Sequence, residues 1–266
     1  MRGIAILVAT ILALGPLGAG AQDSNADKST LTQFLESSLS SAGRQVEITG
    51  FRGALSSVAS LDEMTFADDA GIWLTLRDVS LDWNRAALLT GRISINQLRA
   101  GQIVISRTPT TAAPHTTAEA TPFRLPELPI SVQIAQIEAG RVDLGAAILG
   151  EKVGLSIRGA LTLGSGEGSA DLAIARVDGV NGRMTLAGHF TNASRKLDLA
   201  LNLAEPRGGI IARLANLPDT PAVDLTINGT GTLDDFKAQL TLDTDGERRL
   251  TGGVVLAGTS GFRADI

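Results

Sequence analysis

Residues 196–203 read KLDLALNL, so that every second position is leucine. Successive side chains of a β-strand point to opposite faces, and this octapeptide therefore has one apolar face and one largely polar face. The same alternation recurs before and after it, at Val153–Leu163 and Val223–Ile227. Turn dipeptides such as Asp178-Gly179 and Asp245-Gly246 separate the runs. The series predicts a long antiparallel meander of strands with one continuous apolar face.

The expected fold is mainly β, with a strongly coiled antiparallel sheet. Gly159 and Gly188 lie inside the predicted strands, where glycine favours bending of the sheet. In the run 72–83 the apolar positions are even as far as Leu76 and odd from Val79 onward. This change of phase near residues 77–78 predicts a bulge or a sharp bend that re-aims the apolar face.

Composition narrows the classes of function. Hydrophobic residues make up 44% of the 266 residues, but aromatic residues only 3%, so the apolar content is almost entirely aliphatic. The net charge of −5 comes without a basic stripe, which argues against nucleic acid as a partner. Cysteine is absent, so neither disulfides nor thiolate chemistry is available to the chain.

The N-terminus has the pattern of an export segment. Met1-Arg2 precedes an apolar stretch, Pro16 interrupts it, and Ala19-Gly20-Ala21 offers a small-residue exit. Residues 1–21 are therefore expected to act as a signal peptide or as a signal anchor, and local sequence leaves both readings open. A short amphipathic helix follows, with Thr30 as its N-cap and Gly43 placed to end it. Its apolar positions are Leu31, Phe34, Leu35 and Leu39.

Three further regions follow the leader. Residues 29–107 combine the amphipathic helix with strands expected at 46–48, 58–66, 72–83, 93–95 and 103–105, and residues 68–71 form a hairpin signal. Residues 108–130 are rich in Pro, Thr and Ala and are expected to form a linker or a long extended loop. Residues 131–266 form the β-repeat region, with strands at 132–137 and 142–144 before the meander and a helical turn at 208–217. This region is expected to be truncated, because 261–266 lack a closing turn.

A search for catalytic groups predicts no active site, no cofactor and no metal. His115 lies in the Pro/Thr-rich segment, and His189 lies in a strand where an ordinary structural position is the stronger interpretation. The acidic pairs 62–63, 68–69 and 234–235 lie at turns or strand ends, which favours solvated turn acids over a converging pair. Trp73 and Trp83 are expected to be core anchors, with the lining of a groove as the alternative.

Two blocks of short motifs resemble the TamB family of the AsmA-like superfamily. The first contains residues 50–55 (GFRGAL), 71–74 (GIWL), 76–79 (LRDV), 81–85 (LDWNR), 87–89 (ALL) and 91–93 (GRI). The second contains residues 223–231, 233–235, 240–242 and 250–252. The resemblance implies a β-taco, a sheet rolled into an open hydrophobic groove that conducts phospholipid between the inner and outer membranes. It also implies a link to outer-membrane protein assembly with a TamA-like Omp85 partner, although the family's C-terminal contact region has no counterpart here.

We therefore expect a cell-envelope protein, associated with the inner membrane through its N-terminal segment and with its body in the periplasm. Its expected partner is phospholipid or a nascent outer-membrane protein. A structural or adhesive β-solenoid with a closed core is the alternative, and an enzyme ranks third. The residues expected to line the groove are Leu74, Leu81, Ile93, Leu161, Leu199, Leu201, Leu225 and Ile227.

Overall fold

The computed structural model describes residues 36, 40, 45–53, 56–110, 125, 131–257 and 261–265. The predicted leader at 1–21 lies outside these residues, as does the helix expected from Thr30, apart from Glu36 and Ser40. No helix within the described ranges is long and apolar enough to cross a membrane. The predicted linker at 108–130 is described only at 108–110 and Leu125, and the division of the chain into domains stays a prediction.

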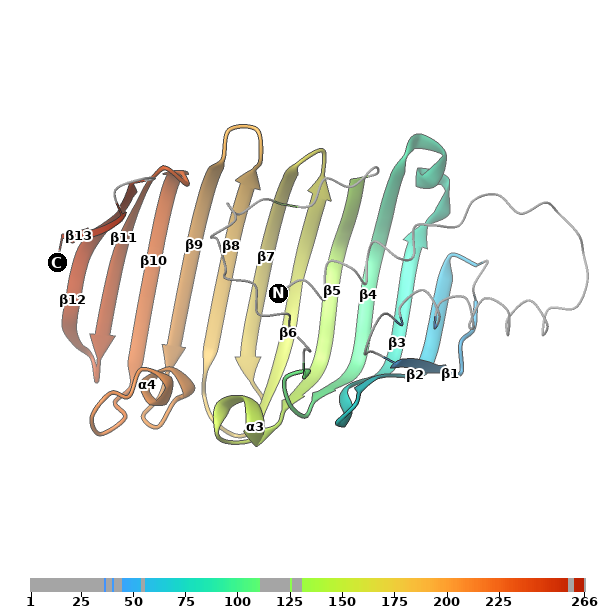
Figure 1. Ribbon diagram of the computed structural model, residues 1–266, viewed down its shortest axis with the longest axis horizontal. Helices are drawn as coiled ribbons and strands as arrows, with labels where there is room; N and C mark the ends of the chain where they lie inside the picture. The colour runs from blue at the N-terminus through green and yellow to red at the C-terminus, as the bar shows by residue number, and fades with distance from the viewer. Residues whose placement is uncertain are drawn as a thin grey trace, which may run out of the picture.

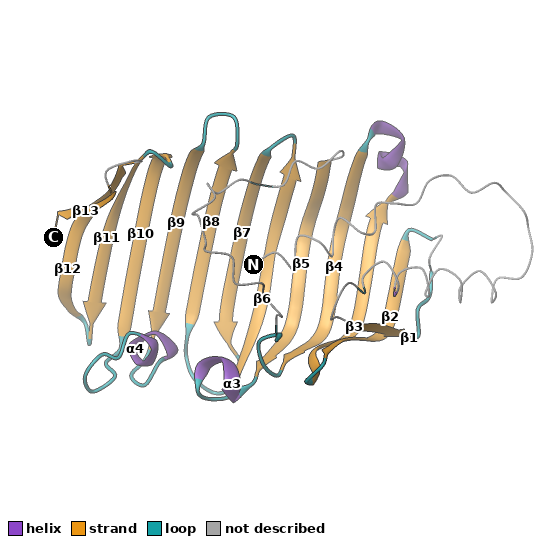
Figure 2. Cartoon of the chain, viewed as in Figure 1, coloured by secondary structure: helices purple, strands orange, loops and turns teal. Residues whose placement is uncertain are grey.

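One sheet of thirteen strands, in the order of the sequence, accounts for most of the described chain (Figures 1 and 2). The mainly β fold expected from the alternation is therefore confirmed. The strands are β1 (Gln45–Thr49), β2 (Val58–Asp68), β3 (Gly71–Asn84), β4 (Arg92–Ile105), β5 (Ser131–Leu144), β6 (Val153–Gly164), β7 (Glu167–Arg176), β8 (Arg183–Thr191), β9 (Lys196–Glu205), β10 (Val223–Thr232), β11 (Asp235–Thr244), β12 (Glu247–Ala257) and β13 (Gly261–Asp265).

The expectation of a wholly antiparallel sheet is wrong at one pair. β4 and β5 run parallel, with Arg92 opposite Ser131 and Ile105 opposite Leu144, whereas all other neighbouring strands are antiparallel. A parallel pair needs a long crossover connection, and the residues between Ile105 and Ser131 supply the length. Within the described chain β1 and β13 each pair with one strand, so the sheet is mixed and does not close on itself.

Two pairs of short predicted strands are each one long strand in the structure. The runs expected at 93–95 and 103–105 belong to β4, and those at 132–137 and 142–144 belong to β5, each of 14 residues. The sequence pattern breaks inside both strands because their apolar alternation changes phase there. The hairpin predicted at 68–71 is confirmed between β2 and β3.

The phase change predicted near residues 77–78 involves a special backbone conformation. Asp78 has φ of 51°, in the left-handed region that non-glycine residues rarely adopt. The pairs on either side nevertheless keep one register, with Leu61 opposite Val79 and Glu63 opposite Arg77. β3 therefore changes phase without shifting against β2, and both halves of the strand present their apolar residues to the same side.

The neighbouring strands change phase at the same level as Asp78. A Cβ on Gly101 would lie 2.9 Å from Cβ of Asp78, so the glycine in β4 leaves room for this turn of the backbone. β5 follows β4 in constant parallel register through this region. The mismatch is taken up between β5 and β6, whose register shifts between Ala139 and Val142. The predicted irregularity is thus a feature shared by several strands.

Short helices lie in the connections between strands, along the two edges of the sheet where the strands begin and end (Figure 2). They are η1 (Arg85–Thr90), α3 (Ala146–Leu149) and α4 (Ile210–Leu214). The helical turn predicted at 208–217 is confirmed by α4. Its Ala212 is fully buried, and the backbone N–H of Ile211 donates to Oε2 of Glu205 at 2.8 Å. Glu205 thereby fixes α4 against the end of β9.

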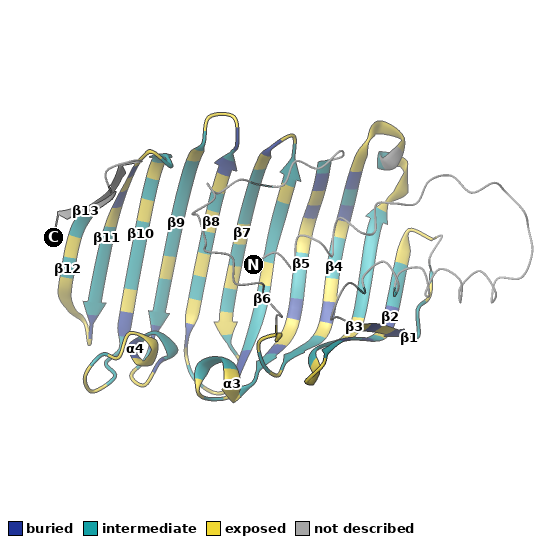
Figure 3. Cartoon of the chain, in the orientation of Figure 1, coloured by how far each residue is buried: buried dark blue, intermediate teal, exposed yellow. Residues whose placement is uncertain are grey.

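Most of the buried hydrophobic side chains lie in β1–β5 (Figure 3). One cluster joins β1 and β2, and a second joins β4 and β5 through Val132 and Ile134, which are 1% and 2% exposed. Trp73 packs on the first cluster, its ring 6.0 Å from that of Phe66, and Trp83 packs on the second. The structure thus favours the core interpretation of both tryptophans.

We expect the cost of truncating an isoleucine to differ between the two halves of the sheet. Ile134→Ala leaves a cavity at a buried site and should lower the free energy of unfolding by about 2–5 kcal/mol. Ile174→Ala on half-buried β7 should cost clearly less, because the side chain already faces solvent on one side. Urea denaturation measures both values. Equal losses would contradict the difference in burial.

Candidate functional site

The strand register lines up apolar residues in rows that cross the sheet. One row contains Ala59, Leu81, Leu98, Ile137, Gly159, Leu172, Leu186, Leu201, Ile227 and Leu240. The adjacent row contains Leu61, Val79, Ala100, Ala139, Ile157, Ile174, Met184, Leu203, Leu225 and Leu242. From β2 to β11 each position in these rows is apolar or glycine. We name the side of the sheet that carries them the apolar face, and the opposite side the polar face.

The residues predicted to line a groove all lie on the apolar face. Leu81, Leu201 and Ile227 belong to the first row, and Leu225 belongs to the second. Leu161 and Leu199 share a third row, and Ile93 is joined to the same face through its partner Val132. Leu74 lies between Phe66 and Ile105 near the other end of the strands. Their common face is a result of the register, whereas a ligand groove along them stays a prediction.

Exposure divides the apolar face into two parts. Ile93 is only 5% exposed, as befits the core of β4 and β5. Leu161, Leu199, Leu201 and Leu225 are half-buried, and so are the other leucines and isoleucines of β6 to β11 on this face. In β8 half-buried and exposed residues alternate strictly until Phe190 (Figure 3). A contiguous aliphatic surface that keeps part of its area in solvent is typical of an interaction site.

The third row, which contains Leu161 and Leu199, consists mostly of small residues from β7 to β11. Ala170, Gly188, Gly229 and Ala238 occupy it on β7, β8, β10 and β11, with Leu199 on β9. A Cβ on Gly188 would find no atom closer than 3.9 Å, whereas a Cβ on Gly229 would meet the ring of Phe236 at 2.3 Å. The surface is therefore low at Gly188, and Phe236 leans over Gly229.

An ionic cluster lies on the apolar face at the strand ends that adjoin α3 and α4. Arg176 stands opposite Leu155 in the register, and its side chain is only 6% exposed. Its Nη2 lies 2.8 Å from Oδ2 of Asp178 and 3.6 Å from Oε1 of Glu151. Arg213 of α4 donates to Oε2 of the same glutamate at 2.6 Å. The cluster thus pairs a cation on the apolar face with carboxylates from the adjoining loops.

Asp178 is the most strongly held acid of this cluster. Besides Arg176, the backbone N–H of Gly154 donates to its Oδ2 at 3.0 Å. The hydrogen bond from Arg176 lowers the pKa of Asp178 to about 2, with the Gly154 N–H acting in the same direction and desolvation opposing both. The carboxylate is therefore charged throughout the neutral and mildly acidic range.

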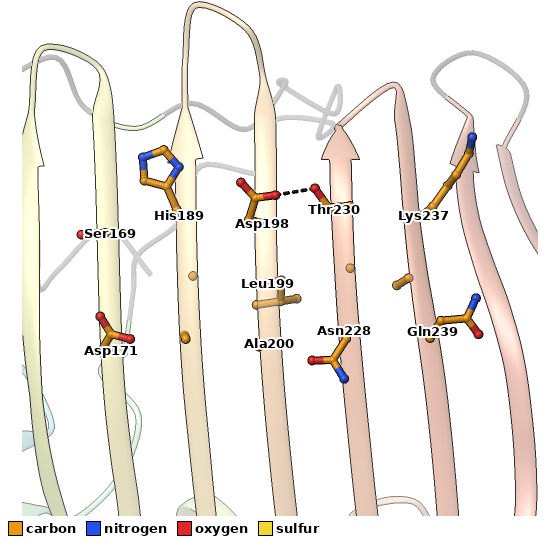
Figure 4. Close-up of a pocket in the computed structure, with 14 residues that line it drawn as sticks. Ser169, Asp171, His189, Asp198, Leu199, Ala200, Asn228, Thr230, Lys237 and Gln239 are labelled. Atoms are coloured by element: carbon orange, nitrogen blue, oxygen red, sulfur yellow. Dashed lines mark hydrogen bonds between the residues drawn. The ribbon is translucent and has the colours of Figure 1, made fainter.

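A shallow depression on the polar face brings together residues that sequence reasoning had separated (Figure 4). His189 on β8 lies opposite Ser169 on β7 and Asp198 on β9. Asp198, however, accepts hydrogen bonds from Thr230 and an ion pair from Lys196 at 3.2 Å, and the Thr230 hydrogen bond is the main cause that lowers its pKa. Thr230 and Lys196 thus bind the Asp198 carboxylate, and the Ser-His-Asp row carries no catalytic assignment. Counting residues outward from the turn at 192–195, which joins β8 to β9, could have paired His189 with Asp198 from the sequence.

The acidic pairs do not converge, but one member, Asp68, is not solvated as expected. Asp62 and Glu63 contact different arginines, Arg52 and Arg77. The side chain of Asp68 is only 2% exposed, which corrects the prediction of a solvated turn acid. Arg107 binds its carboxylate, the Thr110 backbone N–H donates to Oδ2 at 2.8 Å, and the hydrogen bond from Arg107 holds the pKa of Asp68 well below its usual range. The backbone N–H of Ala70 also donates to Oδ1 at 2.9 Å, but the other partners come from the stretch after β4, which local sequence patterns cannot pair with Asp68.

In the described part of the chain, no three His, Asp or Glu residues are placed to hold a metal ion. His115 lies outside the described residues. Comparisons with protein-family models, with curated proteins and with solved structures give no match for this chain. The resemblance of two sequence blocks to the TamB family therefore stays an expectation.

The pKa of Asp178 leads to a test in acid. Because the folded-state pKa is depressed, the ionised carboxylate stabilises the fold above about pH 4, and this contribution, roughly 2 kcal/mol, is lost as the pH falls towards 2. Asp178→Asn should therefore lower the free energy of unfolding at pH 6 by about that amount and much less near pH 2. Asp224→Asn, at an exposed position on β10, is the control. A constant difference between pH 6 and pH 2 would contradict the assignment.

Proposed function

We propose that the apolar face of β6–β11 binds aliphatic chains, and that the acyl chains of phospholipid are its ligand. The observation that carries the proposal is a continuous series of half-buried side chains in two adjacent rows across these strands, all leucine or isoleucine apart from Met184 and Gly159. Each methylene withdrawn from water contributes about 0.8 kcal/mol, so an acyl chain laid across several strands gains a substantial free energy of transfer.

The chemistry of the face suits a ligand without polar groups. The two rows hold only Leu, Ile, Met and Gly between β6 and β11, and they offer no side-chain hydrogen bond to a ligand. Non-directional contacts of similar strength at successive strands let a chain bind in many equivalent positions. The rows run across the strands, along the long dimension of the sheet in Figure 1. Movement of a bound acyl chain along a row would require no single essential residue.

The proposed setting is the cell envelope. The export pattern at 1–21 and the resemblance to the TamB family support a periplasmic body that carries phospholipid between inner and outer membranes, or that assists outer-membrane protein assembly. The half-buried state of β6–β11 favours this reading over an adhesive β-solenoid, because a closed core would bury these side chains as fully as Val132 and Ile134. Catalysis has no part in the proposal.

Adjacent residues of β9 provide a matched test of the binding face. Leu201 lies on the apolar face and Asn202 on the polar face, so Leu201→Asp and Asn202→Asp add the same charge on opposite sides. Binding of a fluorescent phosphatidylethanolamine should weaken at least about tenfold in the first variant, which equals about 1.4 kcal/mol, and less than about twofold in the second.

Circular dichroism checks that each variant keeps its sheet, and Leu201→Met, which conserves volume and polarity, should bind as the unaltered chain does. Equal binding by Leu201→Asp and Asn202→Asp in folded protein would refute the apolar face as the lipid site.

A further inference from the structure

A buried polar side chain lies on the apolar face at the strand ends farthest from α3 and α4. Asn192 follows β8 directly, is 9% exposed, and continues the face of Phe190 by strand alternation. Its backbone N–H donates to the carbonyl oxygen of Gly166 at 2.7 Å, in the turn between β6 and β7. A carboxamide so placed must find partners for both its donor and its acceptor, because an unmade hydrogen bond at a buried site is costly.

Both partners come from one residue, Leu125. The backbone N–H of Leu125 donates to Oδ1 of Asn192, and Nδ2 of Asn192 donates to the carbonyl oxygen of Leu125, each at 2.9 Å. The two residues of a hydrogen-bonded pair in an antiparallel sheet exchange the same two hydrogen bonds. The Asn192 side chain therefore makes with Leu125 the two hydrogen bonds that a neighbouring strand residue would make.

The side chain of Leu125 has its own seat beside this pair. A Cβ on Gly168 would lie 2.8 Å from Cδ1 of Leu125 and 3.4 Å from Cδ1 of Leu163. Glycine inside a strand is unfavourable, by roughly 0.5–1 kcal/mol relative to alanine, and the φ angle of Gly168 is not one that demands glycine. The space it leaves for a leucine accounts for its presence.

We propose that Asn192, Gly168 and Leu163 form a binding subsite for a leucine of an extended polypeptide, filled within the chain by Leu125. The peptide backbone supplies what this subsite requires, a donor for Oδ1 and an acceptor for Nδ2 on the same edge, next to an aliphatic side chain. An acyl ester of phospholipid has no N–H group to offer Oδ1. The subsite thus adds peptide recognition to a face whose rows suit acyl chains, and it does not depend on lipid binding.

The test vacates the subsite and refills it in trans. Leu125→Pro removes both the N–H group and the leucine side chain of the internal ligand. The probe is a fluorescent peptide with the sequence of residues 121–130, TPFRLPELPI, compared with the same peptide carrying proline at the position of Leu125. The vacated protein should bind the leucine peptide at least about tenfold more tightly than the unaltered chain does, and at least about tenfold more tightly than it binds the proline peptide.

Two substitutions in the Leu125→Pro protein separate recognition from general adhesion. Asn192→Asp keeps the shape of the side chain but replaces its donor by an oxygen, and Gly168→Val fills the seat; each should lower peptide affinity at least about tenfold. Gly188→Val, on the neighbouring strand where a Cβ has room, is the control and should leave the affinity within about twofold. The Leu125→Ala protein keeps the backbone N–H of the internal ligand. It should bind the leucine peptide with an affinity between those of the unaltered chain and the Leu125→Pro protein, and it replaces the proline variant if that variant does not fold. Equal binding of the leucine and proline peptides by the folded Leu125→Pro protein would overturn the subsite. So would a preference for the leucine peptide that Asn192→Asp leaves unchanged. Asn192 would then only tether Leu125 within the chain.

Discussion

The structure depends on the agreement between side-chain alternation and strand register. Because alternation has a period of two, a slip of one residue at any hairpin would move the apolar set of every later strand to the opposite face. The register keeps Leu172, Leu186 and Leu201 opposite one another through three successive strands, and where β3 changes phase at Asp78, β4 and β5 change with it. A single apolar face from β2 to β11 is the result.

That face is buried towards β4 and β5 and partly exposed from β6 to β11. Around Val132 and Ile134 the apolar side chains are removed from water and form a core. From β6 to β11 the same kind of residue, in the same rows, keeps part of its surface exposed. The two ends of these strands are marked by polar groups that satisfy one another, Arg176 with Asp178 at one end and Asn192 with Leu125 at the other. The face between them is aliphatic, which suits a ligand held by apolar contact alone.

Local pattern was enough to predict the β fold, the shared face of Leu74, Leu81, Leu161, Leu199 and the related groove residues, the hairpin at 68–71 and the helical turn α4. It was not enough where distant segments meet. Alternation carries no strand direction, so the parallel pairing of β4 with β5 could not be read from it. Burial of Asp68 by Arg107, and the contact of Asn192 with Leu125, join residues that are far apart in sequence. The row Ser169, His189 and Asp198 was missed because strands were read one at a time.

Cysteine scanning along β9 can show whether the apolar face of β6–β11 is a binding surface, because the chain contains no cysteine of its own. Single cysteines at Leu199, Ala200, Leu201, Asn202 and Leu203 would be labelled with a maleimide in the absence and presence of phospholipid. We expect every position to react without lipid, and lipid to protect positions 199, 201 and 203 but to leave 200 and 202 reactive. Uniform protection, or none at the leucine positions, would contradict this expectation.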